Sequence, residues 1–463
     1  MKPNIIVFLT DQQRWDSCGC YGQQLPVTPE LDRMAQHGTC FSHAFSPQPL
    51  CTPARSCLQT GRYASETGVF MLDIALPTDE KTIAHRMSEV GYDTGYIGKW
   101  HLAATNLRYA DPKKRPGQQE PFECFVDPIP EDRRGGYDYW LASNHLESTT
   151  QGYGGHLFDG EGKRREFPEG RFRVDAMTDW ALEYLDSRTE EKPFFLFLSF
   201  IEPHWQNNRK AHDSPYGMAE QFEGAEIPGD LKDYQGQPAW LIPNWRDEYS
   251  HYLACCHSLD QNLVRIRSKL SEMGVADNTV LAFTSDHGCH FGKHNTGAKD
   301  SCHDASIRVP LVIDGPGFTG GGKNGHMASL IDLPPTLMRA AGIEIPDTMR
   351  GRPLQEAVDV NADAWRDEVF YQISPSILGR GIRNKQWKFS VKAPDKDGWD
   401  EVSSPVYVDE FLFDLERDPH ELNNLVDDPD YESVRVQLRA RLVERIVEAG
   451  EPRPEITSSL VEA

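Results

Sequence analysis

Short apolar runs alternate with segments of helical periodicity through most of this chain. Four runs are rich in β-branched and aromatic residues, as is typical of parallel strands buried on both faces: 4–10, 92–97, 193–201 and 279–284. Segments with a helical pattern lie between them: 29–35, 82–90, 174–185 and 246–270. This alternation predicts an α/β domain with a mostly parallel sheet.

The pattern changes towards the C-terminus. Three shorter runs predict strands of a small antiparallel sheet: 368–373, 381–391 and 410–414. Four apolar residues then recur at every fourth position and predict an amphipathic closing helix: Val434, Leu438, Leu442 and Ile446. We therefore predict two units, an α/β unit over residues 1–345 and a smaller α+β unit over residues 346–463.

Composition indicates a folded globule that binds neither nucleic acid nor membrane. The chain has 463 residues, of which 38% are hydrophobic, enough for a large buried core. The net charge is −23 and no basic stripe offsets it, which disfavours nucleic acid as a partner. The longest dense apolar run, 194–201, is far shorter than a membrane span.

Cysteine usage and the N-terminus bear on the compartment. The ten cysteines do not have the spacing of a small disulfide scaffold. The first residues run directly into a predicted strand, and no signal peptide is visible. These features predict a cytoplasmic protein, or a periplasmic or secreted one if a leader has been removed.

Two short segments carry candidate chemistry. Asp11 follows the first predicted strand, where α/β sheets bind ligands; the alternative is a helix cap. Pro53 and Gly61 mark the first turn and the end of a predicted helix. Cys51 would then lie at a helix N-terminus, which usually lowers the pKa of a thiol; the alternative is a buried structural cysteine.

The segment 286–303 is dense in cysteine and histidine and suggests structural zinc as one alternative. The residues concerned are His287, Cys289, His290, His294, Cys302 and His303. Their spacings match no common zinc pattern and include no Cys-x-x-Cys pair, which argues against zinc.

Several motifs resemble those of the type I, formylglycine-dependent sulfatases of the alkaline phosphatase-like superfamily. The first is Cys51-Thr52-Pro53-Ala54-Arg55, followed by Thr60-Gly61-Arg62, with Ala54 where many members have serine. The others are Gly98-Lys99-Trp100-His101, Pro203-His204 and Ser285-Asp286-His287-Gly288. The motifs keep the family order, and the resemblance covers nearly the whole chain.

The resemblance implies a fold and a reaction. The expected fold is an alkaline phosphatase-like sandwich: a large mixed, mostly parallel sheet flanked by helices, plus a smaller C-terminal α+β subdomain. The expected reaction is hydrolysis of a sulfate monoester. A maturation enzyme would convert Cys51 to formylglycine, whose hydrate attacks sulfur and later releases sulfate by regenerating the aldehyde.

The resemblance also implies roles for individual residues. One Ca²⁺, or alternatively Mg²⁺ or Mn²⁺, would be held by five residues: Asp11, Gln12, modified Cys51, Asp286 and His287. Gln12 stands where most members have aspartate, and its carbonyl oxygen is a donor that calcium accepts. The expected catalytic residues are Cys51, Arg55, Lys99, His101, His204 and Lys299.

Within this set, Lys99 and Lys299 would bind the sulfate oxygens and Arg55 would hold the formylglycine. His101 would act as a base, and His204 or Lys299 would protonate the leaving alcohol. His204, His294 and Arg380 are further candidates for substrate binding; for Arg380 the alternative is a surface arginine. We also expect one of two roles for Trp140, Asn144 and His145: contact with the substrate or a position in a surface loop.

The substrate is expected to be a small sulfated molecule, in particular a sulfated carbohydrate, because the long predicted loops between residues 104 and 245 are rich in Trp, Tyr and His. The alternatives are an aryl or alkyl sulfatase, a phosphate or phosphonate monoesterase on the same scaffold, and a non-catalytic anion-binding relative. The sequence does not indicate the oligomeric state.

Overall fold

The computed structural model describes residues 2–103, 126–188, 192–235, 244–295, 297–359 and 364–458. Within these residues, eleven strands form one large mixed sheet. In sheet order they are β11 (Lys323–Ser329), β2 (Thr39–Phe45), β10 (Leu311–Asp314), β8 (Thr279–Ser285), β1 (Asn4–Asp11), β7 (Phe194–Pro203), β3 (Asp93–Lys99), β4 (Tyr139–Ser143), β5 (His156–Asp159) and β6 (Arg164–Glu166), with β9 (Arg308–Val309) paired to β2. The five central strands, β8 to β4, are parallel.

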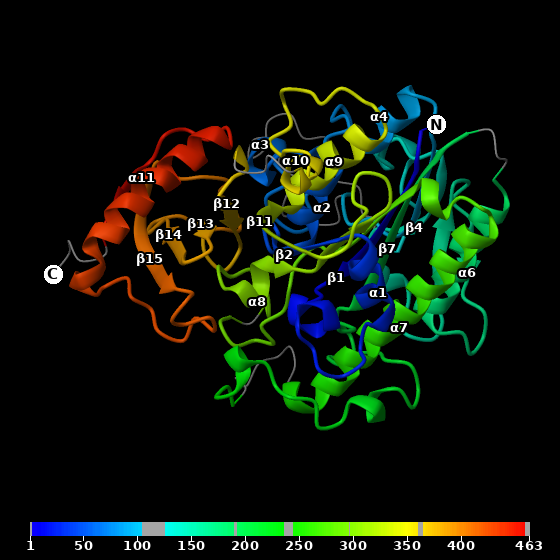
Figure 1. The fold of residues 1–463 in the computed structure, drawn as a ribbon, viewed down its shortest axis with the longest axis horizontal. Coiled ribbons are helices and arrows are strands. Elements are labelled where there is room, and N and C mark those ends of the chain that lie inside the picture. The colour runs from blue at the N-terminus through cyan, green and yellow to red at the C-terminus, as the bar shows by residue number, and fades with distance from the viewer. Residues whose placement is uncertain are drawn as a thin grey trace.

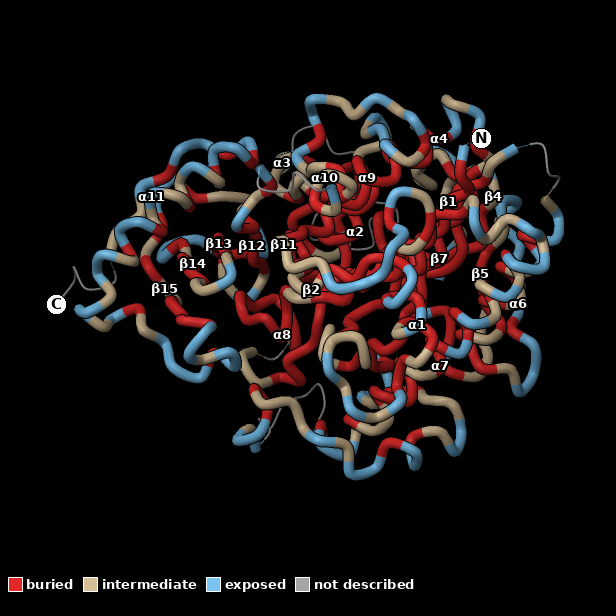
Figure 2. Tube along the Cα trace, in the orientation of Figure 1, coloured by how far each residue is buried: buried red, intermediate tan, exposed pale blue. Residues whose placement is uncertain are grey.

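Helices cover both faces of this sheet (Figure 1). One face carries α2 (Cys51–Thr60), α4 (Ile83–Glu89) and α9 (Leu333–Ala340). The other carries α1 (Pro29–His37), α6 (Arg173–Asp186) and α7 (Trp245–Glu272). Side chains of β1 point alternately into the two cores, Val7 towards α2 and Phe8 towards α7, so the strand is apolar throughout. Figure 2 shows that burial is concentrated in these strands.

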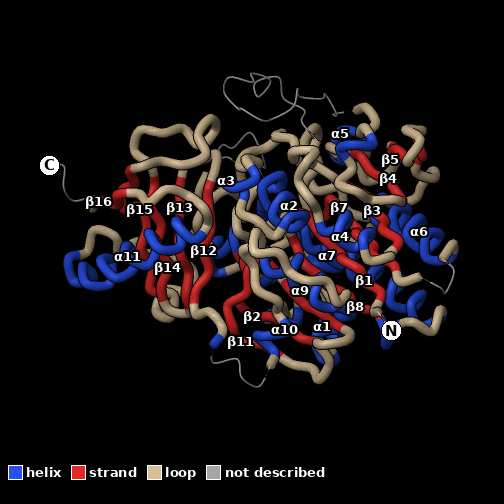
Figure 3. Tube along the Cα trace, turned by 90° about the horizontal axis from the view of Figure 1, so that it is seen from above, coloured by secondary structure: helices blue, strands red, loops and turns tan. Residues whose placement is uncertain are grey.

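A second sheet lies beside the large one (Figure 3). Its strands are β12 (Glu368–Ile373), β13 (Gly379–Asn384), β14 (Trp387–Lys392), β15 (Val406–Asp414) and β16 (Glu455–Thr457). The closing helix α11 (Glu432–Glu448) packs on one face through Leu438 and Leu442. The opposite face packs against the large unit, where Tyr371 meets Phe45 and Met327.

The predicted fold class is confirmed, with two local corrections. The single strand expected at 381–391 is a hairpin, β13 and β14, because Asn384 Oδ1 accepts hydrogen bonds from two following backbone N–H groups. The segment 126–172, expected to be irregular, adds β4, β5 and β6 to the sheet; residues 104–125 lie outside the described part. The unit boundary at residue 345 falls between β11 and β12 and stays a prediction.

The remaining α-helices in the described part of the chain are single turns: α3 (Ala64–Thr67), α5 (Leu146–Thr149), α8 (Asp304–Ile307) and α10 (Gln355–Val358). No helix in these described ranges combines the length and the apolar character that a bilayer crossing needs.

A buried ionic cluster joins the two units. Asp304 of α8 accepts from Arg383 of β13 at 3.1 Å and from Lys388 of β14 at 2.6 Å. Lys388 also pairs with Glu421, and all four side chains are buried. Removing one partner from such a cluster would leave an uncompensated buried charge. The cluster therefore holds the small sheet against α8.

Arg380 belongs to the small unit and faces inward. Its guanidinium contacts both carboxylate oxygens of Glu451 at 2.9 and 3.0 Å and donates to the Val402 carbonyl. Only 1% of the residue is exposed. The expectation that Arg380 binds substrate is therefore wrong, and so is its surface alternative, because Glu451 already occupies its charge inside the fold.

We expect Arg380→Ala to lower the free energy of unfolding by about 3–5 kcal/mol, because Glu451 would be left buried without a counter-charge. Denaturant unfolding of the purified variant measures this loss. The matched control is Arg417→Ala, whose 77% exposed side chain lies 3.6 Å from Asp414 and should cost no more than about 1 kcal/mol. Equal losses in the two variants would contradict the buried-pair interpretation.

Candidate active site

The candidate site lies where four adjacent parallel strands end. Asp11 ends β1, Lys99 ends β3, His204 follows β7, and Asp286 follows β8. Because these strands are neighbours and run in the same direction, their ends meet at one edge of the sheet. The N-terminus of α2, with Cys51, lies against this edge.

Glycine is required near the end of strand β3, at the position before Lys99. Gly98 has a φ of 116°, and a Cβ atom there would lie 2.0 Å from the Ser199 carbonyl oxygen of β7. Only glycine takes this backbone conformation at so close an approach. Lys99 is thereby brought beneath the site, fully buried.

Four side chains form a buried cluster that can hold a metal ion: Asp11, Cys51, Asp286 and His287. One potential donor atom from each lies within 4.8 Å of the others. His287 Nδ1 donates to the Gly288 carbonyl at 2.9 Å, which leaves Nε2 as the free acceptor facing Cys51 Sγ at 3.1 Å. Burial lowers the pKa of His287 to about 4, so the ring is neutral, as a metal ligand must be.

Gln12 completes an oxygen-rich donor set. Its backbone N–H binds Asp286 Oδ1 at 3.2 Å, and its side-chain Nε2 lies 3.3 Å from Cys289 Sγ. The remaining atom, Oε1, is buried without a hydrogen-bond partner among the described residues. An orphaned carbonyl oxygen next to two carboxylates and a neutral imidazole fits a divalent cation that prefers oxygen.

Arg55 ties this cluster together. It donates to Asp286 Oδ2 at 3.1 Å and to Asp11 Oδ2 at 3.0 Å. Its Nη1 also donates to the Lys99 carbonyl at 2.8 Å and to Ser199 Oγ at 2.6 Å. One guanidinium of α2 thus bonds to β1, β3, β7 and the end of β8.

Two buried lysines surround the cluster with positive charge. Lys299 Nζ lies 3.0 Å from Cys51 Sγ, and Lys99 Nζ lies 3.0 Å from Asp11 Oδ2. Burial alone would lower both lysine pKa values. Asp11 and then Glu147 raise the pKa of Lys99, whereas a Cys51 thiolate and then Asp11 raise that of Lys299. Both lysines are therefore protonated.

The Cys51 side chain is a neutral thiol in this setting. Burial, and then Asp11, raise its pKa to about 12 despite the two lysines. The interpretation of Cys51 as a low-pKa thiol is therefore wrong, because burial beside a carboxylate outweighs the helix N-terminus.

Next to the lysines, two histidines are held neutral. His204 Nδ1 lies 2.7 Å from the Trp205 carbonyl, and its Nε2 lies 3.2 Å from Lys299 Nζ. Burial, and then Lys299, lower the pKa of His204 well below its usual value. Burial, and then His145 and Lys99, lower that of His101 to about 3.

A second group of possible metal ligands lies close to this site. It consists of Asp73, His101 and His145. His145 Nε2 lies 2.7 Å from Asp73 Oδ1, and His101 Nε2 lies 3.6 Å from it. The sequence motifs gave no signal for Asp73 or for Glu147, the partner of Lys99, because both lie in segments without a shared pattern.

These residues open into a cavity of about 590 Å³. Cys51, His101, His204 and Lys299 are in its lining. Its lining also includes Leu72, Asn207, Asn295, Asp300, Pro375, Ser376 and Trp399. The last three belong to the C-terminal unit, so both units build the pocket.

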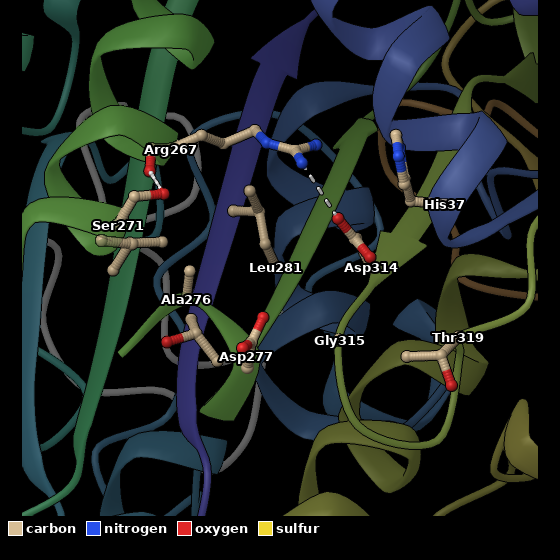
Figure 4. A pocket seen from close by; sticks show the side chains of 11 residues that line it. His37, Arg267, Ser271, Ala276, Asp277, Leu281, Asp314, Gly315 and Thr319 are labelled. Atoms are coloured by element: carbon tan, nitrogen blue, oxygen red, sulfur yellow. Dashed lines mark hydrogen bonds and ion pairs between the residues drawn. The ribbon is translucent and has the colours of Figure 1, made fainter. Parts of the chain in front are cut away.

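A separate cavity of about 490 Å³ lies at the opposite end of β8 (Figure 4). Arg267 of α7 reaches across it to Asp314 at 3.3 Å, and Asp277 lines it as well. None of the predicted site residues is in its lining.

Some predicted residues lie elsewhere. His294 stacks on His303 with ring centroids 3.4 Å apart and is not in the pocket lining. In the described residues neither possible metal-ligand group includes Cys289, Cys302 or His303, which contradicts the zinc alternative. Trp140 packs on Tyr96, and Asn144 bonds to the Ala103 backbone, so neither is in a surface loop.

Comparison with known proteins places the chain in a family. The sequence model of the Sulfatase family matches residues 3–343, and that of the N-sulphoglucosamine sulphohydrolase C-terminal region matches residues 292–448. An ulvan-active sulfatase of Formosa agariphila is 29% identical over 97% of this chain and 82% of its own. An N-acetylglucosamine-6-O-sulfatase of Bacteroides thetaiotaomicron is 24% identical over 96% of this chain and 86% of its own.

The solved structure of yidJ from Bacteroides fragilis has a TM-score of 0.79 and 26% identity, and the match covers 97% of each chain. The family match spans both halves of the metal cluster, the Cys51 helix and both lysines. The chain therefore belongs to the Sulfatase family and is a sulfuric ester hydrolase with the alkaline phosphatase-like fold.

Proposed function

We propose that this chain hydrolyses a sulfate monoester of a carbohydrate, with the sulfate bound at the base of the pocket beside Cys51. The supporting observation is the group of cations there: Lys299 Nζ lies 3.0 Å from Cys51 Sγ, and Lys99 Nζ lies 3.0 Å from Asp11. Fixed cations in a buried site stabilise charge that develops on a transferred anion. In a chain of net charge −23, these cations, together with the divalent metal that the carboxylates would hold, favour a small anionic group as ligand.

The family implies a formylglycine at position 51 and a divalent metal beside it. Hydrated formylglycine supplies the nucleophilic hydroxyl, and the metal supplies Lewis-acid charge. Asp11, Gln12, Asp286 and His287 would hold Ca²⁺, because oxygen donors dominate the set. Arg55 fixes both carboxylates and would orient the modified residue. A formylglycine-generating enzyme would then be an obligatory partner during maturation. We propose that this maturation takes place in the cytoplasm.

Lys299 is a better proton donor to the leaving alcohol than His204. The contact between them is 3.2 Å, and His204 already uses Nδ1 on the Trp205 carbonyl. Since the pKa of His204 is lowered by burial and that of Lys299 is raised by Asp11 against burial, the shared proton resides on Lys299. Neutral His101 also lines the pocket, but its pKa of about 3 makes it a weak base until an anionic substrate is bound beside it.

A sugar suits the outer part of the pocket. Trp399 and Leu72 offer apolar surface, and Asn207 and Asn295 offer amide groups. Sugars present both apolar ring faces and hydroxyl groups, so this mixture suits them better than a purely apolar group. Two relatives named for carbohydrate substrates, ulvan and N-acetylglucosamine 6-sulfate, support this substrate class. Aryl and alkyl sulfates are the alternative.

The reaction is tested with 4-nitrophenyl sulfate and 4-nitrophenyl phosphate, which share one leaving group. We expect a higher kcat/KM for the sulfate, because the cations match a singly charged sulfate ester. Faster turnover of the phosphate would instead identify a phosphate or phosphonate monoesterase. Tight binding without turnover of either, by fully modified protein, would identify a non-catalytic relative.

Modification of Cys51 is expected in protein made in a host with the maturation enzyme. Trypsin releases residues 34–55, which contain both Cys40 and Cys51. After alkylation, Cys40 should carry the label, whereas position 51 should show the mass of an aldehyde in place of the thiol. Two alkylated cysteines in active protein would rule out the proposed nucleophile.

Calcium should stabilise the folded protein through Gln12 and its neighbours. At a concentration about 100 times Kd, Ca²⁺ should add about 2.7 kcal/mol to the free energy of unfolding of metal-stripped protein. Gln12→Ala should weaken Ca²⁺ binding at least about 10-fold in calorimetry, because it removes an oxygen donor. Gln261→Ala, on the exposed side of α7, is the matched control. Unchanged Ca²⁺ affinity in Gln12→Ala would exclude Gln12 as a ligand.

A further inference from the structure

The second group of possible metal ligands differs in chemistry from the first. Asp73, His101 and His145, here called the histidine site, each offer one donor atom, and the three atoms lie within 4.8 Å of one another. Two of these donors are imidazole nitrogens, whereas the cluster around Asp11 and Asp286 is rich in oxygen. Imidazole suits zinc and neighbouring transition metals, and carboxylate-rich sets suit calcium. The two groups therefore favour different ions.

The distances within the histidine site are close to those around a tetrahedral ion. His145 Nε2 lies 2.7 Å from Asp73 Oδ1, and His101 Nε2 lies 3.6 Å from the same oxygen. Donors that lie about 2.1 Å from a tetrahedral Zn²⁺ are about 3.4 Å from one another. Small shifts of these side chains therefore suffice to place an ion between them.

The backbone holds the two histidines side by side. His101 N–H donates to the carbonyl of Asn144, the residue before His145, at 3.0 Å. The Asn144 side chain also bonds to the backbone N–H and carbonyl of Ala103, at 3.0 and 2.8 Å. His101 and Asp73 have φ angles of 56° and 61°, a left-handed conformation that non-glycine residues keep only when their surroundings enforce it. The donors are thus fixed before any ion binds.

The remaining ring nitrogens are also arranged as in a metal site. His145 Nδ1 lies 3.8 Å from Glu147 Oε1, and a carboxylate on the far side of the ring is typical of metal-bound histidine. Neither ring nitrogen of His101 has a hydrogen-bond partner among the described residues, and its 3.6 Å contact with Asp73 is too long for one. An ion at Nε2 would supply the partner that this buried ring lacks.

The burial of these donors does not exclude an ion. His101 is 3% exposed, and Asp11, Asp286 and His287 of the first cluster are each 0% exposed. A metal ion lies among its donor atoms, so it needs no open surface at each of them. His101 and His145 line the pocket of about 590 Å³, which provides a path for entry. The fourth coordination position of the ion would then face the pocket.

We propose that Asp73, His101 and His145 bind a second divalent ion, with a preference for zinc, and that this ion inhibits hydrolysis. The bound ion takes the Nε2 lone pair of His101, so the ring can no longer act as a base. The ion also carries its open coordination position into the space that receives the substrate. Zinc binding at this site does not depend on the proposed carbohydrate substrate; only the inhibition depends on sulfate ester hydrolysis.

The test uses mature wild-type enzyme loaded with calcium, so that position 51 offers no thiol to zinc. Titration with zinc chloride in a calorimeter, followed by gel filtration and elemental analysis, should give one zinc per chain with the calcium retained. Hydrolysis of 4-nitrophenyl sulfate should fall about 10-fold or more at saturating zinc, because a general base is lost. The half-maximal zinc concentration should equal the calorimetric Kd. Binding of no zinc, or of zinc only with release of calcium, would overturn the inference.

Two variants locate the ion. Asp73→Ala and His145→Ala each remove one ligand and should each weaken zinc binding at least about 10-fold. Inhibition is scored as the ratio of turnover with and without zinc in the same variant, so a change in basal turnover cancels. The matched control is Glu248→Ala, which removes a carboxylate 2.9 Å from His212, outside the pocket lining. It should leave both zinc affinity and the inhibition ratio unchanged.

Wild-type zinc affinity in both ligand variants would overturn the inference, because the zinc would then lie elsewhere. Zinc bound at the histidine site without loss of turnover would overturn the inhibition. The stoichiometry of the wild-type enzyme decides the matter by itself if a variant does not fold. Failure to hydrolyse any sulfate, with zinc binding as expected, would instead refute the proposed function and leave the zinc site standing.

Discussion

The site depends on one buried guanidinium. Arg55 bonds to Asp11 and Asp286, and at the same time to groups of β3 and β7. Without it, two carboxylates at adjacent strand ends would repel each other in a medium that screens poorly. Its five N–H donors in a planar fork suit this task, which a lysine could not perform. Because Arg55 is one turn into α2, the same contacts also fix Cys51 over the cluster.

Burial then decides the chemistry of each group around Arg55. It keeps the Cys51 thiol protonated, with a pKa of about 12, so the unmodified side chain is a poor nucleophile. It keeps His287 neutral and thus able to coordinate a metal. Lys99 stays charged because Asp11 and Glu147 lie 3.0 and 3.3 Å from its ammonium group. A cysteine that is inert as a thiol is consistent with a family in which that position is chemically converted.

The site residues that the sequence predicted are those that belong to local motifs. Asp11, Lys99 and Asp286 follow apolar runs long enough to identify as parallel strands, so their meeting at one sheet edge followed from topology. Arg380 was misassigned because its partner Glu451 is 71 residues away and no local pattern signals that pair. Asp300 and Trp399 were missed for the same reason: tertiary packing, not a motif, brings them to the pocket.

The residues that the sequence motifs predicted and those that they did not predict belong to different parts of the pocket. Groups at the strand ends act on the sulfate, and their geometry is fixed by the parallel sheet. Pro375, Ser376 and Trp399 reach the pocket from the C-terminal unit, whose position depends on the buried Asp304, Arg383 and Lys388 contacts. Ser376 also bonds to the Asp300 carbonyl, so the smaller unit helps to hold the wall beside Lys299. Loops of this kind can change with little effect on the sheet edge, which lets one reaction centre serve different leaving groups.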